Sequence, residues 1–133
     1  METSDVFSPV ERLLRDSLND IVIEKHHNIV SIKAVFALDD SLPFFAGHFP
    51  AQPVFPAVLQ VAIVRLLSSE AVKLTLQNDS LGKTKFSNII RPKERIIVDI
   101  DLCLKDIVYE AKFVFYNVGK VASSGTINYK IAG

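Results

Sequence analysis

A single histidine, His48, stands in the stretch FFAGHFPAQPVFPAVLQ, immediately ahead of an apolar segment. Imidazole changes its charge near neutral pH, so it can take a proton from a substrate and return it. Pro50, Pro53 and Pro56 stiffen the backbone around it, and Gly47 permits a positive φ angle or the close approach of a ligand. These residues predict a histidine base that is held in a fixed position.

The segment that follows the histidine predicts a helix from Pro56 to about Val72. Proline suits a first helical turn, because its missing N–H group would have had no partner there. The first N–H groups of a helix are unpaired and carry partial positive charge, so they can polarise a carbonyl while imidazole takes the neighbouring proton. The spacing equally fits a structural role, in which His48 is a capped loop histidine and Gly47 serves a turn.

The other elements predict an α+β arrangement around this segment. Ser8, Pro9 and Glu11 mark the start of a short amphipathic helix with a capping box. The first two turns after Pro56 are apolar almost all round, so we expect that helix to be enclosed. One such helix packed on an antiparallel sheet, in a single domain over residues 1–133, fits the order of elements.

Alternation of apolar residues indicates the strands of this sheet. One strand is expected around residues 30–38, a strand-like stretch ends near Pro92, and NVGK is expected to form a tight hairpin turn. The remaining strands are marked by three apolar sets: Ile96, Val98, Ile100, Leu102 and Leu104; Tyr109, Ala111, Phe113 and Phe115; and Val121, Ile127, Tyr129 and Ile131.

Composition narrows the class of protein. The 133 residues are 49% apolar, and 15 basic residues balance 15 acidic ones, so neither nucleic acid nor an anionic membrane is an expected partner. A single cysteine, Cys103, fits a reducing compartment, and it is expected to be packed in a strand. With no apolar signal-peptide core near the N-terminus, we expect a cytoplasmic protein.

The histidine stretch closely resembles the motif FFxGHFPxxPxxPGVL of bacterial 3-hydroxyacyl-[acyl-carrier-protein] dehydratases. The matching residues are Phe44, Phe45, Gly47, His48, Phe49, Pro50, Pro53, Pro56, Val58 and Leu59. The resemblance implies the hotdog fold, in which a long helix is gripped by a curved antiparallel sheet. It also implies a dimer, or a higher oligomer, whose acyl tunnels lie at the subunit interface.

The resemblance also implies roles for individual residues. His48 is expected to remove the C2 proton of a 3-hydroxyacyl thioester, while the N–H groups of Ala57 and Val58 hold the thioester oxygen. The expected substrate contacts are Gly47, Phe49, Pro56, Ala57, Val58 and Gln60. The substrate is expected on acyl carrier protein or coenzyme A, and neither a metal nor an organic cofactor is expected.

Two positions depart from the family pattern. Ala57 replaces a glycine, which leaves the N–H group available but narrows the approach to it. Ala62 stands where the family has a Glu or Asp, which by this resemblance reaches across from the partner subunit's helix and protonates the leaving hydroxyl, and its loss is expected to slow dehydration by about 10²–10⁴. Glu70 lies on roughly the same helical face but about 12 Å further along. Water, the substrate or Gln60 would stand in for the missing acid.

Alternative roles remain open for the other polar residues. Gln60 fits either the orientation of a water or hydroxyl group or a hydrogen bond to the backbone of a neighbouring strand. Arg65 fits a phosphate of a carrier arm or an ion pair at an interface. His26 and His27 are adjacent at a strand end, so their side chains point to opposite faces and do not form a metal pair.

Three functions follow in order of preference. The first is a dehydratase that converts a 3-hydroxyacyl thioester into a trans-2-enoyl thioester, in fatty-acid or related polyketide or polyene biosynthesis. The second is a catalytically weak or silent acyl-thioester-binding subunit that pairs with an active partner. The third is an acyl thioesterase, ranked last because such enzymes commonly need the carboxylate that Ala62 replaces.

Overall fold

Most strands of the sheet carry apolar residues at every second position, and an apolar helix covers one face of the sheet. The computed structural model describes residues 8–39, 55–91 and 93–132. The elements are α1 (Pro9–Asp16), β1 (Leu18–His26), β2 (Ile29–Ala37), α2 (Ala57–Val72), β3 (Leu76–Phe86), β4 (Arg95–Lys105), β5 (Val108–Asn117) and β6 (Lys120–Ile131).

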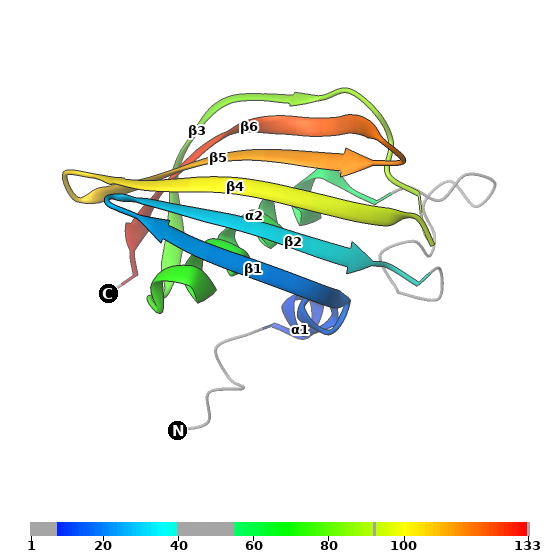
Figure 1. Ribbon diagram of the computed structural model, residues 1–133, viewed down its shortest axis with the longest axis horizontal. Helices are drawn as coiled ribbons and strands as arrows, with labels where there is room; N and C mark the ends of the chain where they lie inside the picture. The colour runs from blue at the N-terminus through cyan, green and yellow to red at the C-terminus, as the bar shows by residue number, and fades with distance from the viewer. Residues whose placement is uncertain (1–7, 40–54, 92, 133) are drawn as a thin grey trace.

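The six strands form one antiparallel sheet in the order β1-β2-β4-β5-β6-β3. Helix α2 lies against one face of this sheet, and α1 packs beside α2 towards the β1 edge (Figure 1). Strand β3 follows α2 in the chain but pairs with β6, so it forms the edge opposite β1. The α+β prediction, an antiparallel sheet with a packed helix, is therefore confirmed.

The core lies between α2 and the inner face of the sheet. On α2, Ile63, Val64 and Leu67 are buried, and they face the alternating residues predicted for the strands. The buried apolar residues of the strands are Ile32, Ala34, Phe36, Leu76, Ile96, Val98, Ile100, Leu102, Ala111, Phe113, Phe115, Ala122, Ile127 and Tyr129. Phe113 and Phe115 also meet edge to face, with ring centroids 5.8 Å apart.

Both helices have ends that follow from local chemistry. The capping box of α1 is present: the Glu11 N–H donates to Ser8 Oγ (3.2 Å), and the Ser8 N–H donates to Glu11 Oε1 (3.0 Å). Helix α2 starts one residue later than predicted, because Pro56 is extended (ψ 146°) and serves as the N-cap. It ends at Lys73, whose left-handed conformation (φ 59°) turns the chain away.

The structure corrects three details of the sequence prediction. Strand β1 is an additional strand, and it escaped notice because most of its residues are exposed. Strand β3 runs from Leu76 to Phe86 and so ends before Pro92, and only its first residue is buried. The prediction that α2 is enclosed is wrong for its first turn in this single chain, since Ala57 is exposed and Val58 is 73% exposed.

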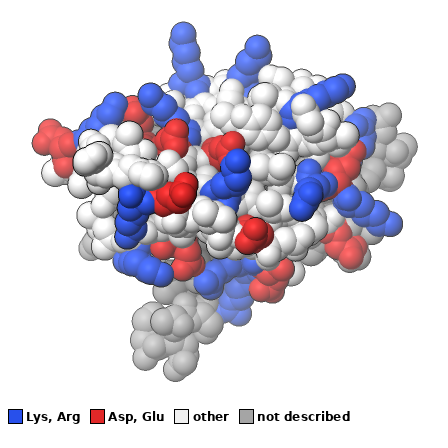
Figure 2. All heavy atoms as spheres, viewed as in Figure 1, with Lys and Arg blue, Asp and Glu red and all other residues white. Residues whose placement is uncertain are grey.

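The outer face of the sheet, turned away from α2, carries charges of both signs. Figure 2 shows Lys, Arg, Asp and Glu interspersed over this face. Lys105 Nζ lies 3.0 Å from Glu110 Oε1, and Lys33 Nζ lies 3.9 Å from Asp99 Oδ1. The predicted NVGK turn is confirmed at the end of β5, where Val118 and Gly119 both have positive φ.

Candidate active site

The first turn of α2 offers backbone N–H groups to an outside acceptor. The N–H groups of Leu59 (3.1 Å) and Gln60 (3.3 Å) both donate to the Pro56 carbonyl, and proline has no side-chain group with which to cap the helix. The N–H groups of Ala57 and Val58 precede the first intrahelical bond, so the helix gives them no acceptor. An oxygen placed at this end would meet both groups and the positive end of the helix dipole.

Phe55, the residue before the N-cap, is fixed from two sides. Its N–H group donates to the Ile90 carbonyl at 2.7 Å, and its side chain is 3% exposed. Ile90 is fully buried, so this bond ties the start of α2 to the segment between β3 and β4. The N-terminal end of α2 is thus anchored independently of the helix itself.

Gln60 is buried and bonded at both ends of its amide. Its Nε2 donates to the Phe55 carbonyl at 3.4 Å, and its Oε1 accepts a 2.6 Å bond from the Ser123 hydroxyl on β6. Gln60 is 4% exposed, and Ser123 is fully buried. The predicted contact of Gln60 with substrate stays a prediction. Gln60 does bond to a neighbouring strand, but to the side chain of Ser123 and not to the strand backbone.

Ala62 lies on the less buried side of α2. It is half-buried and follows the exposed Val58 by four residues, which places both on one helical face. The opposite face carries Ile63, Val64 and Leu67 into the core. A substrate or a second chain could therefore approach along the face of Val58 and Ala62, where the family has its carboxylate.

The two charged residues considered on α2 contact α1. Glu70 lies 3.1 Å from Arg15 and 3.7 Å from Lys73, and it is thirteen residues beyond Ala57, about 20 Å along the helix axis. Arg65 forms an ion pair with Glu11. Both contacts are within one chain and lie away from the first turn of α2.

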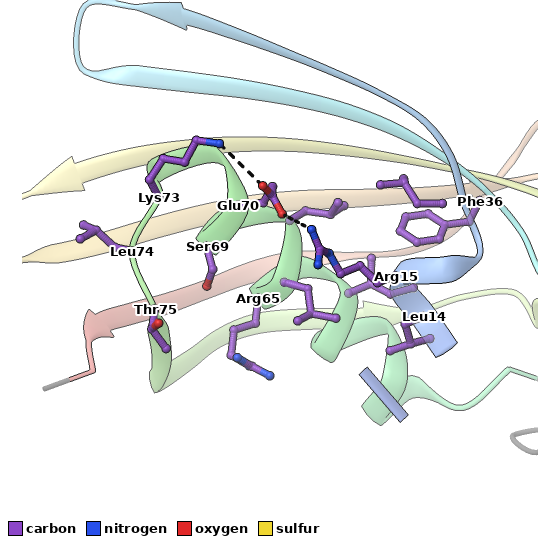
Figure 3. Close-up of a pocket in the computed structure, with 13 residues that line it drawn as sticks. Leu14, Arg15, Phe36, Arg65, Ser69, Glu70, Lys73, Leu74 and Thr75 are labelled. Carbon is purple, nitrogen blue, oxygen red and sulfur yellow. Dashed lines mark hydrogen bonds and ion pairs between the residues drawn. The ribbon is translucent and has the colours of Figure 1, made fainter. Parts of the chain in front are cut away.

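A cavity of about 260 Å³ lies against the second half of α2, and no residue of the first turn of α2 lines it. Figure 3 shows Arg15 and Lys73 reaching Glu70 at this cavity, which Leu14 and Phe36 also line. Its lining residues are Leu14, Arg15, Leu18, Phe36, Ile63, Arg65, Leu66, Leu67, Ser69, Glu70, Lys73, Leu74 and Thr75. The cavity lies between α1 and α2. None of the predicted substrate contacts that the structure describes lines it.

Three predicted site residues, Gly47, His48 and Phe49, lie outside the described residues. Pro56, Ala57, Val58 and Gln60 are brought together at the start of α2. The position of the His48 imidazole relative to the N-terminal end of α2 therefore stays a prediction.

The remaining predicted features lie elsewhere. His26 ends β1, and His27 has a positive φ in the following turn. Cys103 is only half-buried, on the outer face, where it accepts a 3.6 Å bond from Asn28 Nδ2. Within the part of the chain that the structure describes, no group of three His, Cys, Asp or Glu side chains suited to a metal occurs.

Sequence reasoning placed Tyr129 in a strand but did not single out its buried hydroxyl, nor the buried Ser123 and Ser68. Ser123 bonds Gln60, whereas the hydroxyls of Ser68 and Tyr129 have no hydrogen-bond partner among the described residues. Burial raises the pKa of Tyr129 well above its ordinary value, and the charge of Arg65 opposes that shift only in part. No spacing in the sequence signals which strand hydroxyl meets the helix.

Comparisons with known proteins agree with this arrangement. A model of the ApeI-like family, described as ApeI dehydratase, matches residues 23–126. The chain belongs to the ApeI-like dehydratase family. A 3-hydroxyacyl-[acyl-carrier-protein] dehydratase, FabZ, from Caldicellulosiruptor saccharolyticus is 35% identical over 97 residues, which cover 67% of this chain and 69% of the relative.

Solved structures show the fold of this ApeI-like dehydratase. The dehydratase heterocomplex ApeI:P from Xenorhabdus doucetiae matches with a TM-score of 0.69 and 22% identity, over 85% of this chain and 96% of that one. A putative thioesterase, yhdA, from Lactococcus lactis matches with a TM-score of 0.72 and 11% identity, over 95% and 98%. Both likenesses support the hotdog fold, as predicted from the histidine motif.

Family membership also bears on the activity. The predicted resemblance is confirmed. The chain is a divergent hydro-lyase similar to the 3-hydroxyacyl-[acyl-carrier-protein] dehydratases. Among the described residues, no helix is both long enough and apolar enough to span a membrane.

Proposed function

We propose that this protein dehydrates 3-hydroxyacyl thioesters with His48 as the base and the first turn of α2 as the oxyanion site. The observation that carries the proposal is the open N-terminal end of α2, where the helix leaves the N–H groups of Ala57 and Val58 without acceptors. These two groups lie within the histidine motif, nine and ten residues after His48. Within the hotdog fold, α2 takes the part of the long helix gripped by the curved sheet.

The proposed reaction begins at C2 of the substrate. Two N–H donors at the thioester oxygen stabilise the negative charge that develops when the C2 proton leaves. The imidazole of His48 takes this proton, and the electron pair of the C2–H bond is delocalised into the thioester as an enolate. This pair forms the C2–C3 double bond as the C3–O bond breaks, and the hydroxyl gains a proton and leaves as water. The products are a trans-2-enoyl thioester and water.

The proton for the leaving hydroxyl has no carboxyl donor at residue 62. The imidazolium that forms on His48 is itself an acid near neutral pH, so it can return the proton to the hydroxyl directly or through a water molecule. Gln60 contributes no ionisable group, and its amide is engaged with Phe55 and Ser123. We therefore favour a one-residue acid–base cycle over a role for Gln60 as the acid.

A homodimer or a higher oligomer is part of the proposal. Strand β3 is an edge strand of eleven residues, and edge strands present unpaired backbone groups to another chain. Exposed apolar side chains lie at its end and nearby: Phe86, Ile89 and Val121 are each more than 40% exposed. A second copy would cover them, together with Val58.

The proposed substrate is carried on acyl carrier protein or coenzyme A, in the cytoplasm and without a metal or cofactor. Acyl carrier protein is favoured because the FabZ relative bears that carrier in its name. The test is incubation with 3-hydroxyacyl-carrier thioesters, followed by mass spectrometry of the trans-2-enoyl product. His48→Gln should reduce turnover at least a hundredfold. Equal rates for the wild type and His48→Gln would end the proposal.

Ala62 favours a second candidate function, a weak or silent subunit that binds acyl thioesters and completes an active partner. The partner would supply its carboxylate across the interface to the site of His48 in this chain. The ApeI:P structure is described as a heterocomplex, which supports such pairing. Good turnover by the purified homodimer would exclude this candidate, whereas turnover only after a second hotdog chain is added would favour it.

A further inference from the structure

The Gln60 side-chain amide is buried in the core and bonds to two separate segments of the chain. Leaving either end of a buried amide unsatisfied costs about 1–3 kcal/mol, so an apolar residue would be the simpler choice for packing. Gln60 is nonetheless buried on α2, where it accepts from the Ser123 hydroxyl and donates to the Phe55 carbonyl. The three residues form a continuous link from β6, through α2, to the residue before the N-cap.

This link ends at Phe55, directly before the first turn of α2. The Phe55 carbonyl precedes Pro56, and the next two residues carry the N–H groups at the open end of α2. The Phe55 N–H group is held at the same time by the Ile90 carbonyl, 2.7 Å away. Both polar groups of the Phe55 backbone therefore have fixed partners, which leaves the peptide planes at the helix start little freedom.

We propose that Gln60 and Ser123 are positioning residues that fix the direction of the Ala57 and Val58 N–H groups. The inference rests on the proposed function, since it assigns those groups to the thioester oxygen. Their donors must already point at the developing charge, because a catalytic hydrogen bond that has to be reoriented during the reaction loses most of its value. Gln60 acts through Phe55, because both ends of its amide are already bonded within the protein.

Ser123→Ala removes one donor from the link, and α2 provides a matched control. Ser68 is equally buried, and its hydroxyl has no partner among the described residues, so Ser68→Ala deletes the same group without breaking a bond. We expect Ser123→Ala to lower kcat about tenfold, with KM changed less than threefold. Ser68→Ala should leave both constants within twofold of the wild type. Equal kcat values for the two variants, measured where both are fully folded, would overturn the proposal.

Gln60→Glu tests the other end of the link, because it keeps an acceptor for Ser123 but replaces the amide donor to Phe55. Burial raises the pKa of such a carboxyl, and its protonated form can donate to the Phe55 carbonyl. We therefore expect kcat of this variant to approach that of the wild type at low pH and to fall as the carboxyl ionises. Loss of activity to the same extent at every pH would indicate a packing defect and contradict the proposal.

A measurement without turnover separates this inference from the proposed function. In ¹H–¹⁵N spectra, Ser123→Ala should shift the Ala57 and Val58 amide signals and speed exchange of the Phe55 amide, whereas Ser68→Ala should not. If the wild type has no dehydratase activity, the proposed function fails while this readout still decides the positioning. Unchanged signals in Ser123→Ala would overturn the inference even in an active enzyme.

Discussion

Arg65 on α2 forms an ion pair with Glu11 on α1, and both side chains are largely removed from water, being 24% and 16% exposed. Glu11 has a second task, because its carboxylate also accepts the Ser8 N–H in the capping box. A second ion pair, Arg15 with Glu70, joins the same helices but is about half exposed. Helix α1 is therefore held on α2 by two contacts of unequal strength, beside its buried Leu14.

Glu11→Gln should separate the two tasks of this carboxylate. The glutamine oxygen can still accept the Ser8 N–H, so the capping box survives, but Arg65 is left half-buried without its counter-charge. We expect a loss of about 1–2 kcal/mol in the free energy of unfolding, measured in urea. Arg15→Met, which breaks the exposed pair, should cost less than about 1 kcal/mol. Similar losses for the two variants would show that burial of the pair is unimportant.

Tyr129 should make the protein sensitive to alkaline pH. Burial raises its pKa in the folded state, whereas the unfolded chain ionises near its ordinary value of about 10. Above that pH the unfolded state binds fewer protons than the folded state, so stability falls as pH rises, by up to about 1.4 kcal/mol per pH unit. Below pH 9 both states keep the proton, and this residue contributes no pH dependence.

Tyr129→Phe provides the measurement. The hydroxyl has no partner among the described residues, so its removal should leave stability at pH 8 equal to the wild type or raise it by up to about 1 kcal/mol. The advantage of the variant should then grow between pH 10 and pH 11 in urea titrations. A constant difference between the two proteins over this range would contradict the assigned pKa shift.

Gly125 on β6 should tolerate no side chain. A Cβ atom there would lie 2.6 Å from Thr84 Cγ2 and 2.8 Å from the Lys83 carbonyl oxygen, so β3 would have to move. We expect Gly125→Ala to lower the free energy of unfolding by about 1–3 kcal/mol. Gly82→Ala is the matched control on the facing strand, where the nearest atom is 3.2 Å away, and it should cost less. The reverse order would contradict the register of β3 on β6.

The sequence predicted the central strands well because most of their inner-face residues are buried, although Leu104 near the end of β4 is 45% exposed. Ile96, Val98 and Ile100 alternate in β4 and are all buried, as the period of two requires. The edge strands were placed poorly, since β1 and β3 have one neighbour each and little apolar alternation. Val121 is 41% exposed although it was grouped with core residues, because a bulge between Phe115 and Tyr116 shifts the register there.

The candidate site was predictable only in part. The start of α2 follows from Pro56 and the apolar run behind it, so Ala57 and Val58 lie in its first turn, and their contact with substrate stays a prediction. The link through Gln60 was not predictable, because Ser123 lies 63 residues away and its side chain carries no sign of its partner. The loss of the acid at Ala62 was visible at once, since it is a difference in residue type and needs no geometry.

Ala62→Glu should restore the missing acid and so raise the rate. A carboxyl at this half-buried position has its pKa raised by desolvation, which keeps part of it protonated and able to donate to the leaving hydroxyl. We expect kcat to rise at least tenfold at pH 6, with a new decline in rate at higher pH as the carboxyl ionises. Ala62→Gln has the same size without the proton, and it should leave kcat at or below the wild-type value. An equal gain in both variants would attribute the effect to shape, and no gain in Ala62→Glu would show that protonation of the leaving group does not limit this enzyme.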